Sequence, residues 1–217
     1  MVYGEMHKEL VFEAIPKDLI AASSFIHFGS AMRMPLMDAG GTAELFRYAH
    51  TLGKTTLMDC CAISGIYESG YWLDTLDGAL RETDLFVPSY TEACMLTGKT
   101  ELPDIRDALE KYGFRYLLIK LGGQGCYLTD YHEEQTIPTY DGFERVDTTG
   151  VGDSFVGGLI RGLLEEWPVP TAVRFANAVA SYNITRKGAT GGVPDFETVY
   201  RFVTNLDGGA DLFPLLP

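Results

Sequence analysis

Short apolar runs alternate with amphipathic stretches along the first half of the chain. Strands are predicted at residues 25–28, 55–59, 84–87 and 115–121, and helices at residues 42–52, 71–81, 91–96 and 105–112. The last of these strands reads R-Y-L-L-I-K-L and is apolar nearly throughout, which is typical of a strand covered on both faces. Alternation of this kind predicts an α/β fold, with a largely parallel sheet and helices on both of its sides.

The pattern changes after residue 122. Two short antiparallel strands are expected at residues 125–129 and 134–139 around a polar turn, followed by long helices at residues 151–166 and 171–187. The second helix is expected to stop at Gly188, as a left-handed C-cap. The Gly- and Pro-rich tail, residues 205–217, is expected to pack irregularly. Because no repeat, low-complexity block or linker interrupts the sequence, we predict a single domain over residues 1–217.

The composition limits the kinds of partner. The 217 residues include 17 Lys and Arg against 30 Asp and Glu, so the formal net charge is −13. This excess opposes binding to nucleic acids and to anionic membranes, and it means that any phosphate ligand must be held by local groups. No apolar run approaches the roughly 18 residues of a membrane helix, and residues 1–9 lack the pattern of a signal peptide. We therefore expect a cytoplasmic protein.

The cysteines fit a reducing compartment. Cys60, Cys61, Cys94 and Cys126 include no C-x-x-C pair and have no His partner at metal-ligand spacing. The adjacent Cys60 and Cys61 cannot easily bridge one another. Buried reduced thiols are therefore predicted, and neither a zinc site nor a disulfide framework is supported.

The most informative stretch is residues 146–164, V-D-T-T-G-V-G-D-S-F-V-G-G-L-I-R-G-L-L. Gly150 and Gly152 let the backbone turn tightly where a helix begins, so that the first amides are free to point at an anion. Asp153 follows in the first helical turn, where the helix dipole favours the ionised carboxylate. An anion hole beside a carboxylate is what phosphoryl transfer to an alcohol needs. Taken alone, these residues leave open a glycine-rich loop with an ordinary Asp helix cap.

A second glycine cluster, Lys120-Leu121-Gly122-Gly123-Gln124-Gly125, follows the buried strand. Glycines at the carboxyl end of a strand let a ligand approach the backbone closely. The cluster is neither a Walker loop, since G-K-[ST] is absent, nor a dinucleotide fingerprint, since the G-x-G-x-x-G spacing is missing. A simple hairpin turn remains the alternative.

Together these segments resemble the ribokinase-like, or PfkB, carbohydrate kinases. D-T-T-G-V-G-D at residues 147–153 resembles the family's D-T-x-G-A-G-D signature, with Val151 for the usual Ala, and L-G-G-Q-G at residues 121–125 matches its L-G-x-x-G loop. Residues 176–194, A-N-A-V-A-S-Y-N-I-T-R-K-G-A-T-G-G-V-P, resemble the segment that closes the nucleotide site in that family. The resemblance implies a three-layer α/β/α ribokinase-like fold and ATP-dependent transfer to a hydroxyl of a small sugar or sugar acid.

The resemblance also implies roles for single residues. Asp153 would be the catalytic base, with the amides of Gly150, Val151 and Gly152 as the anion hole. The ATP phosphates and ribose would lie along Lys120, Gly122, Gly123, Gln124 and Gly125, with Asn177 beside the adenine. An activating monovalent cation such as K⁺ would be held by Asp147, the carbonyl of Thr149, and backbone carbonyls near Arg186, Gly188 and Gly192. Without the resemblance, Asp147 reads as a turn residue and Asn177 as a polar position on a buried helix.

A magnesium site is implied by P-S-Y-T-E at residues 88–92, which resembles the family's P-N-x-x-E motif. Glu92 is in place, but Ser89 stands where Asn is usual. Because a hydroxyl can still hydrogen-bond a metal-bound water, we expect an altered Mg²⁺ site rather than a lost one. By itself, Glu92 would be a solvated acid in the first turn of a helix.

The sugar-binding segments of the family, a first strand with an acidic residue, a G-G-x-x-x-N segment and a β lid that often forms a dimer contact, have no counterpart in this sequence. We therefore expect an N-terminally incomplete fold, in which residues 1–15 return from the lid, and a homodimer is possible. Two alternatives follow: the ATP-side portion of a sugar kinase, or a remnant that binds nucleotide without transferring phosphate. A nicotinamide-dependent oxidoreductase is not supported, because its early G-x-G-x-x-G is missing.

Overall fold

Six strands among the described residues form one sheet with the order β1-β2-β3-β4-β5-β6. The structure is a computed structural model, which describes residues 9–62, 70–206, 209 and 211–215. The described residues divide into two compact units, residues 9–119 with 129–134, and residues 120–128 with those from 135 onward.

The first unit contains the parallel strands of the sheet. They are β1 (Phe25–Ala31), β2 (Thr55–Cys60), β3 (Leu85–Phe86) and β4 (Tyr116–Lys120), and each pairs in parallel with the next, for example Leu57 with Leu85 and Leu85 with Tyr116. Leu117, Leu118 and Ile119 of β4 are fully buried. The predicted largely parallel sheet is therefore confirmed.

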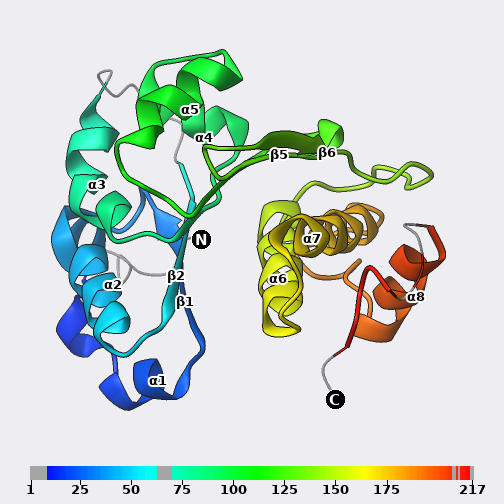
Figure 1. Ribbon diagram of the computed structural model, residues 1–217, viewed down its shortest axis with the longest axis horizontal. Helices are drawn as coiled ribbons and strands as arrows, with labels where there is room; N and C mark the ends of the chain where they lie inside the picture. Colours follow the sequence, from blue (N-terminus) through cyan, green and yellow to red (C-terminus); the bar gives the residue numbers. More distant parts are fainter. Residues whose placement is uncertain (1–8, 63–69, 207–208, 210, 216–217) are drawn as a thin grey trace. The chain divides into compact units, whose positions relative to one another are not determined.

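Helices connect these strands in the order that the sequence predicted. They are α2 (Thr42–Thr51), α3 (Tyr71–Arg81), α4 (Tyr90–Thr97) and α5 (Leu102–Glu110), preceded by the short α1 (Lys17–Ala22), the 3-10 turn η2 (Phe12–Ala14) and a π-helical turn η3 (Met37–Gly41). Helices α2 and α3 lie side by side, and α2 packs against β1 and β2 (Figure 1). Residues 1–8, part of the segment expected to return from a lid, lie outside the described residues.

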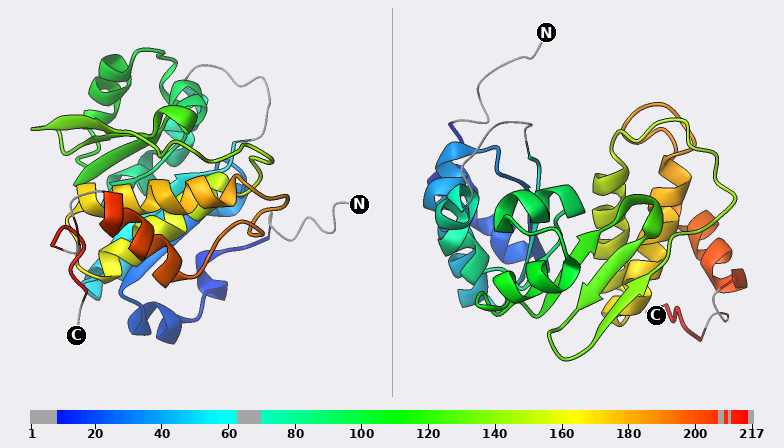
Figure 2. Two further views of the ribbon diagram at one scale, coloured as in Figure 1. Left: turned by 90° about the vertical axis from the view of Figure 1, so that its right-hand side faces the viewer. Right: turned by 90° about the horizontal axis from the view of Figure 1, so that it is seen from above.

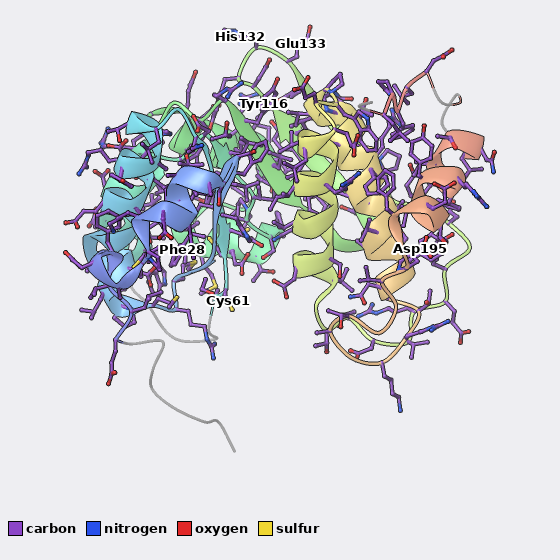
Figure 3. All side chains as sticks on the ribbon, turned by 90° about the horizontal axis from the view of Figure 1, so that it is seen from below. Phe28, Cys61, Tyr116, His132, Glu133 and Asp195 are labelled. Carbon is purple, nitrogen blue, oxygen red and sulfur yellow. The ribbon has the colours of Figure 1, made fainter. Side chains whose placement is uncertain are left out.

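The next element along the chain is a hairpin, of which residues 129–134 are counted with the first unit and the rest with the second. Strands β5 (Cys126–Thr129) and β6 (Glu134–Ile137) are joined by four residues, a connection that permits only antiparallel neighbours. The amides of His132 and Glu133 at the tip of this turn both donate to Asp130 Oδ1, at 3.0 and 2.8 Å (Figure 3). A 3-10 turn, η4 (Gly122–Gln124), precedes β5.

Helices α6 (Val151–Leu164) and α7 (Val169–Asn183) pack closely along their lengths, as both views of Figure 2 show. Small residues allow this approach, since a Cβ atom on Gly158 would lie 2.8 Å from Ala176 Cα, and one on Gly162 would lie 2.8 Å from Ala172 Cβ. Helix α8 (Phe196–Leu206) completes an aromatic core with Trp167, Phe175 and Phe213.

Two expectations about the C-terminal region were wrong. Helix α7 ends at Asn183 and not at Lys187, so Gly188 is not its C-cap, although its φ is +94°. The helix stops early because the carbonyl of Ile184 accepts from the amides of Val146 and Asp147, at 2.9 and 3.2 Å. The irregular tail also starts later than expected, since α8 extends to Leu206. Residues 207, 208, 210, 216 and 217 of that tail lie outside the described residues.

All four cysteines lie among the described residues, and none of them forms a disulfide there. Cys60 and Cys126 are buried, whereas Cys61 and Cys94 are partly exposed. None of the described helices is long and apolar enough to cross a membrane.

Candidate active site

The start of α6 is built around a glycine that no other residue can replace without strain. Gly150 is the N-cap, with φ +72° in the left-handed region. A Cβ atom on Gly150 would lie 2.2 Å from the carbonyl oxygen of Ala189 and 2.7 Å from Ala189 Cα. The missing side chain therefore lets the loop after α7 lie directly against the first turn of α6.

The same helix end carries the features of an anion site. The amides of Gly152 and Asp153 belong to the first turn, which has no intrahelical acceptors, while Val151 donates to Thr148 O over a long 3.4 Å. A Cβ atom on Gly152 would lie 3.7 Å from Lys120 Nζ, so an ammonium group stands beside the positive end of the helix dipole. An ammonium group and free helix amides together favour a bound anion such as a phosphate.

Asp153 is exposed and lies in this first turn, at the rim of a cavity of about 380 Å³. The cavity lies between α6, α7, α8 and the segment 189–194, and its walls include Phe175, Val179 and Phe196. Apolar walls cannot satisfy the hydroxyl groups of a sugar. The cavity is therefore poorly suited to a sugar, and polar contacts to an acceptor must come from other residues.

The second glycine cluster is both a hairpin element and an accessible stretch of backbone. Gly125 has φ +95°, and a Cβ atom on it would lie 2.0 Å from Ile137 O, so this glycine is required by the hairpin. Around Gly122 (φ +60°) and Gly123, in contrast, nothing lies within 4 Å of the position of a Cβ atom. The turn is closed by Leu121 N donating to Gly125 O at 2.8 Å. It leaves Gly122 and Gly123 open to a ligand, next to Lys120.

Asn177 of α7 is buried, and its amide nitrogen donates to the carbonyls of Ile137 and Pro138, both at 3.1 Å. The side chain thus ties the end of β6 to the middle of α7. Asn177 therefore fixes the position of the backbone after β6, and it can affect a nucleotide site through that backbone.

Asp147 connects two loops through its carboxylate. Oδ1 accepts from the amide and hydroxyl of Thr149, at 3.0 and 2.8 Å, and Oδ2 accepts from the amide of Gly188, at 2.9 Å. These hydrogen bonds, led by the one from Gly188, lower the pKa of Asp147 to about 2. Asp147 is more than a turn residue, because it holds the segment before α6 against the segment after α7.

The loop after α7 closes on the end of its own helix. A Cβ atom on Gly192 would lie 2.5 Å from Asn183 O, and the amide of Arg186 donates to the same oxygen at 3.4 Å. Arg186 itself is exposed. The backbone segments named for a cation, at Asp147, Thr149, Gly188 and Gly192, therefore meet at one place in the second unit.

Asn183 was missed at the sequence level, although it is central to this junction. Its side chain is fully buried, and Nδ2 donates to Thr149 O at 3.3 Å and to Ala189 O at 3.0 Å. No pattern in the sequence singles out Asn183, because it lies in the run S-Y-N-I-T-R-K among other polar residues.

In the first unit, Ser89 and Glu92 form a capping box at the start of α4. Ser89 Oγ accepts from the amide of Glu92 at 3.3 Å, and Glu92 Oε2 accepts from the amide and the hydroxyl of Ser89, both at 2.7 Å. Glu92 Oε1 accepts from the amide of Ala62 at 3.1 Å. Glu92 is therefore not the freely solvated acid that its position alone would suggest, because local donors hold both of its oxygens.

In the part of the chain that the structure describes, no three His, Cys, Asp or Glu side chains gather as ligands of a metal ion. Any divalent ion at Glu92 would need ligands from water or from a bound molecule.

The comparison with protein families decides the classification. Residues 3–195 match the model for the "pfkB family carbohydrate kinase". The chain belongs to this family. The match covers the glycine cluster after β4, the start of α6 and the loop after α7, the three segments on which the sequence resemblance rests.

Curated relatives and solved structures agree with this assignment. Ribokinase from Haemophilus influenzae is 33% identical over 133 residues, which cover 58% of this chain and 43% of that protein. The 2-dehydro-3-deoxygluconokinase from Bacillus subtilis is 31% identical over 193 residues, which cover 87% and 59%. This pfkB-family chain thus spans about half the length of these curated relatives.

A crystal structure of aminoimidazole riboside kinase from Salmonella enterica, complexed with aminoimidazole riboside and an ATP analogue, superimposes with a TM-score of 0.76. It is 24% identical, and the match covers 94% of this chain and 70% of that one. The likeness confirms the three-layer α/β/α ribokinase-like fold.

Proposed function

We propose that the protein is an ATP-dependent carbohydrate kinase that transfers the γ-phosphoryl group of Mg-ATP to a hydroxyl of a small sugar or sugar acid. The proposal rests chiefly on one observation, the position of Lys120 Nζ beside Gly152 at the start of α6, with Asp153 in the same turn. These groups supply a cation, helix amides and a carboxylate, the set that phosphoryl transfer to an alcohol requires.

In this proposal Asp153 accepts the proton of the acceptor hydroxyl as its oxygen bonds to the γ-phosphorus of ATP, while the bond from that phosphorus to the β,γ-bridging oxygen breaks and ADP leaves. Lys120 and the amides of Gly150, Val151 and Gly152 stabilise the charge on the moving phosphoryl group. Gly122 and Gly123 let the nucleotide phosphates and ribose lie against the backbone, with Gln124 and Gly125 completing the turn. Asn177 braces the backbone beside the adenine.

The names of the relatives, ribokinase and 2-dehydro-3-deoxygluconokinase, and the riboside in the Salmonella structure support the proposed acceptor class. The nucleotide analogue in the same structure supports ATP as the proposed donor. Because each relative acts on a different acceptor, the proposal extends only to a small sugar, a sugar acid or a riboside.

The residues present are compatible with the two metal ions that the proposal needs. The carboxylate of Glu92 has about four lone-pair sites and uses three of them for Ser89 and Ala62, so one remains for a metal-bound water. Mg²⁺ would neutralise part of the charge of ATP. Asp147 and the carbonyls near Thr149, Arg186, Gly188 and Gly192 offer the oxygen ligands that a monovalent cation such as K⁺ would use.

The test combines binding and turnover. Mg-ATP at about a hundred times its Kd should raise the melting temperature by about 5 to 10 °C. A coupled assay for ADP over a panel of sugars, sugar acids and ribosides should then find an acceptor. Asp153→Asn should reduce kcat by about 10² to 10⁴ while the shift with Mg-ATP persists. Asp141→Asn, an exposed Asp in the same unit, is the matched control and should keep wild-type turnover.

One observation favours a second candidate, binding of the nucleotide without transfer. Ser89 and Glu92 are engaged with each other in a helix cap, which leaves less capacity for Mg²⁺ than free side chains would. If Mg-ATP binds but no acceptor on the panel gives turnover, this candidate replaces the kinase. If Mg-ATP gives neither a thermal shift nor heat of binding, both candidates are wrong.

A further inference from the structure

The cavity beside Asp153 has the size and the walls of a site for a small organic molecule. Its volume of about 380 Å³ lies in the range of such sites, which are also lined mainly by apolar groups. The apolar walls come from Phe175 and Val179 of α7, from Phe196 of α8 and from Val193 in the loop before α8. Because these walls offer no partners to the hydroxyl groups of a sugar, the ligand that fits them must be largely apolar.

Two aromatic side chains in the walls favour an aromatic ligand. Phe175 and Phe196 both line the cavity, with their ring centroids 5.5 Å apart and their ring planes at 42°. The guanidinium group of Arg161, which also lines the cavity, lies over the Phe196 ring at 4.3 Å from its centroid. Aromatic rings pack against one another with centroids about 4.5 to 7 Å apart. A flat ring that enters the cavity therefore finds aromatic partners on two helices.

The charged groups at the cavity select the charge of the ligand. Asp153 and Arg161 are eight residues apart on α6, so about 12 Å separates them along the helix axis. Arg161 pairs with Glu165 of the same helix, whereas the carboxylate of Asp153 has no hydrogen-bond or ion-pair partner among the described residues. The formal net charge of −13 also attracts a cation and repels an anion. An ammonium group is therefore the polar group that matches Asp153.

We propose that the cavity binds a small aromatic amine, with the ring between α6, α7 and α8 and the ammonium group on the carboxylate of Asp153. Gly157, midway between Asp153 and Arg161, gives the ring room, since nothing lies within 4 Å of the position of a Cβ atom on it. The consequence rests on the proposed function. An ammonium group on Asp153 prevents this carboxylate from accepting the proton of an acceptor hydroxyl, so the amine inhibits the kinase in competition with the acceptor.

The first experiment compares three indoles of similar size that differ in charge, namely tryptamine, its neutral analogue tryptophol, and the anion indole-3-propionate. Calorimetry with the wild-type protein, in the absence of nucleotide and sugar, should show that tryptamine binds at least about tenfold more tightly than tryptophol. Indole-3-propionate should bind most weakly, because Asp153 repels its carboxylate. Equal affinities for the three compounds, or no heat of binding with tryptamine, would overturn the inference.

Two substitutions locate the ring and the ammonium group of the bound amine. Gly157→Leu places a side chain in the cavity and should weaken tryptamine binding at least about tenfold. Asp153→Asn removes the negative charge, so tryptamine should then bind no more tightly than tryptophol. If Gly157→Leu binds tryptamine as the wild type does, the general negative charge of the protein holds the amine, and the proposed site is wrong.

The control is Leu164→Ala on the same helix. Leu164 is 44% exposed and does not line the cavity, so this variant should bind tryptamine with wild-type affinity. Should Gly157→Leu fail to fold, the comparison of tryptamine with tryptophol in the wild type and in Asp153→Asn still decides the matter. Binding of tryptamine without any Mg-ATP shift would retain this inference and reject the proposed kinase. An Mg-ATP shift with turnover that tryptamine does not inhibit would do the opposite.

Discussion

Single atoms decide the shape of the site at the start of α6. The φ of +72° and the Ala189 carbonyl 2.2 Å from the position of a Cβ atom make Gly150 the most constrained residue there. A few residues further along the same helix, Gly157 has open space within 4 Å of its Cβ position. The fold therefore requires a glycine at position 150 but would accept a side chain at position 157, a difference that the sequence alone does not show.

Substitution of these glycines by Ala should separate the two roles. Gly150→Ala should lower the free energy of unfolding by at least about 2 kcal/mol, because it adds backbone strain and a collision with Ala189. It should also abolish the thermal shift with Mg-ATP. Gly157→Ala should raise the free energy of unfolding by about 0.5 to 1 kcal/mol, because it removes a flexible residue from a helix interior. Urea denaturation measures both, and equal effects would contradict the structural account.

Asp38 should make stability depend on pH. It is 3% exposed, and its carboxylate accepts from the amides of Met32 and Met34, at 3.2 and 2.9 Å. Burial outweighs these hydrogen bonds and raises the pKa of Asp38 from 3.8 to about 6. Since the unfolded chain loses this proton first, the contribution of Asp38 is complete below pH 3.8 and is lost as the pH rises through about 6.

The free energy of unfolding should therefore fall by roughly 1 to 3 kcal/mol between pH 4 and pH 6.5. Asp38→Asn should remove this part of the pH dependence, whatever constant offset the substitution brings. Urea denaturation of both proteins at several pH values gives the comparison. A difference between variant and wild type that stays constant with pH would show that Asp38 keeps an ordinary pKa.

At the scale of elements, some helix ends follow a local sequence signal and others are set by hydrogen bonds to residues distant in the chain. The capping box of α4 follows the local S-x-x-E pattern and forms as that pattern predicts. The end of α7 does not follow its local signal, Gly188, because the backbone before α6 takes the carbonyl of Ile184. Helix α8 has a local signal at its start, where Asp195 Oδ1 accepts from the amide of Thr198 at 2.8 Å, and it packs on an aromatic core with Trp167 and Phe213.

The cap of α4 can be tested independently of catalysis. Ser89→Ala should lower the free energy of unfolding by about 1 kcal/mol, because it removes the side chain that accepts from Glu92 N. Ser89→Asn should keep most of the stability, since Asn is an equally good N-cap. Thermal or urea unfolding distinguishes them. If Ser89→Ala is neutral, the hydrogen bonds to Glu92 do not stabilise the helix.

At the scale of the whole molecule, the formal charge of −13 acts on every anionic ligand. The positive groups described at the start of α6 are local, namely Lys120 and the helix amides. The general field therefore repels the nucleotide, and the local site must capture it at short range. The cytoplasmic location and a homodimer remain predictions of the sequence.

This balance predicts an unusual response to salt. The association rate of Mg-ATP should rise modestly between 20 and 200 mM choline chloride, because salt screens the repulsion before the nucleotide reaches the site. Removal of Mg²⁺ with EDTA should weaken ATP binding strongly at both salt concentrations. Stopped-flow fluorescence with a labelled nucleotide measures the rate. A steep fall of the rate with salt would mean that the field near the site is attractive.

The sequence by itself determined the alternation of strands and helices, the glycine motifs around Gly122 and Gly150, and through them the family. These features depend on the order of neighbouring residues, which fixes backbone conformation locally. Only the tertiary structure decided where α7 ends and which polar side chains hydrogen-bond to the protein's own backbone. Those side chains include Asn177, Glu92 and Asn183. Those outcomes depend on atoms that come from residues distant in the chain, such as Thr149 and Ala189 around Asn183, and no local pattern records which residues the fold will bring together.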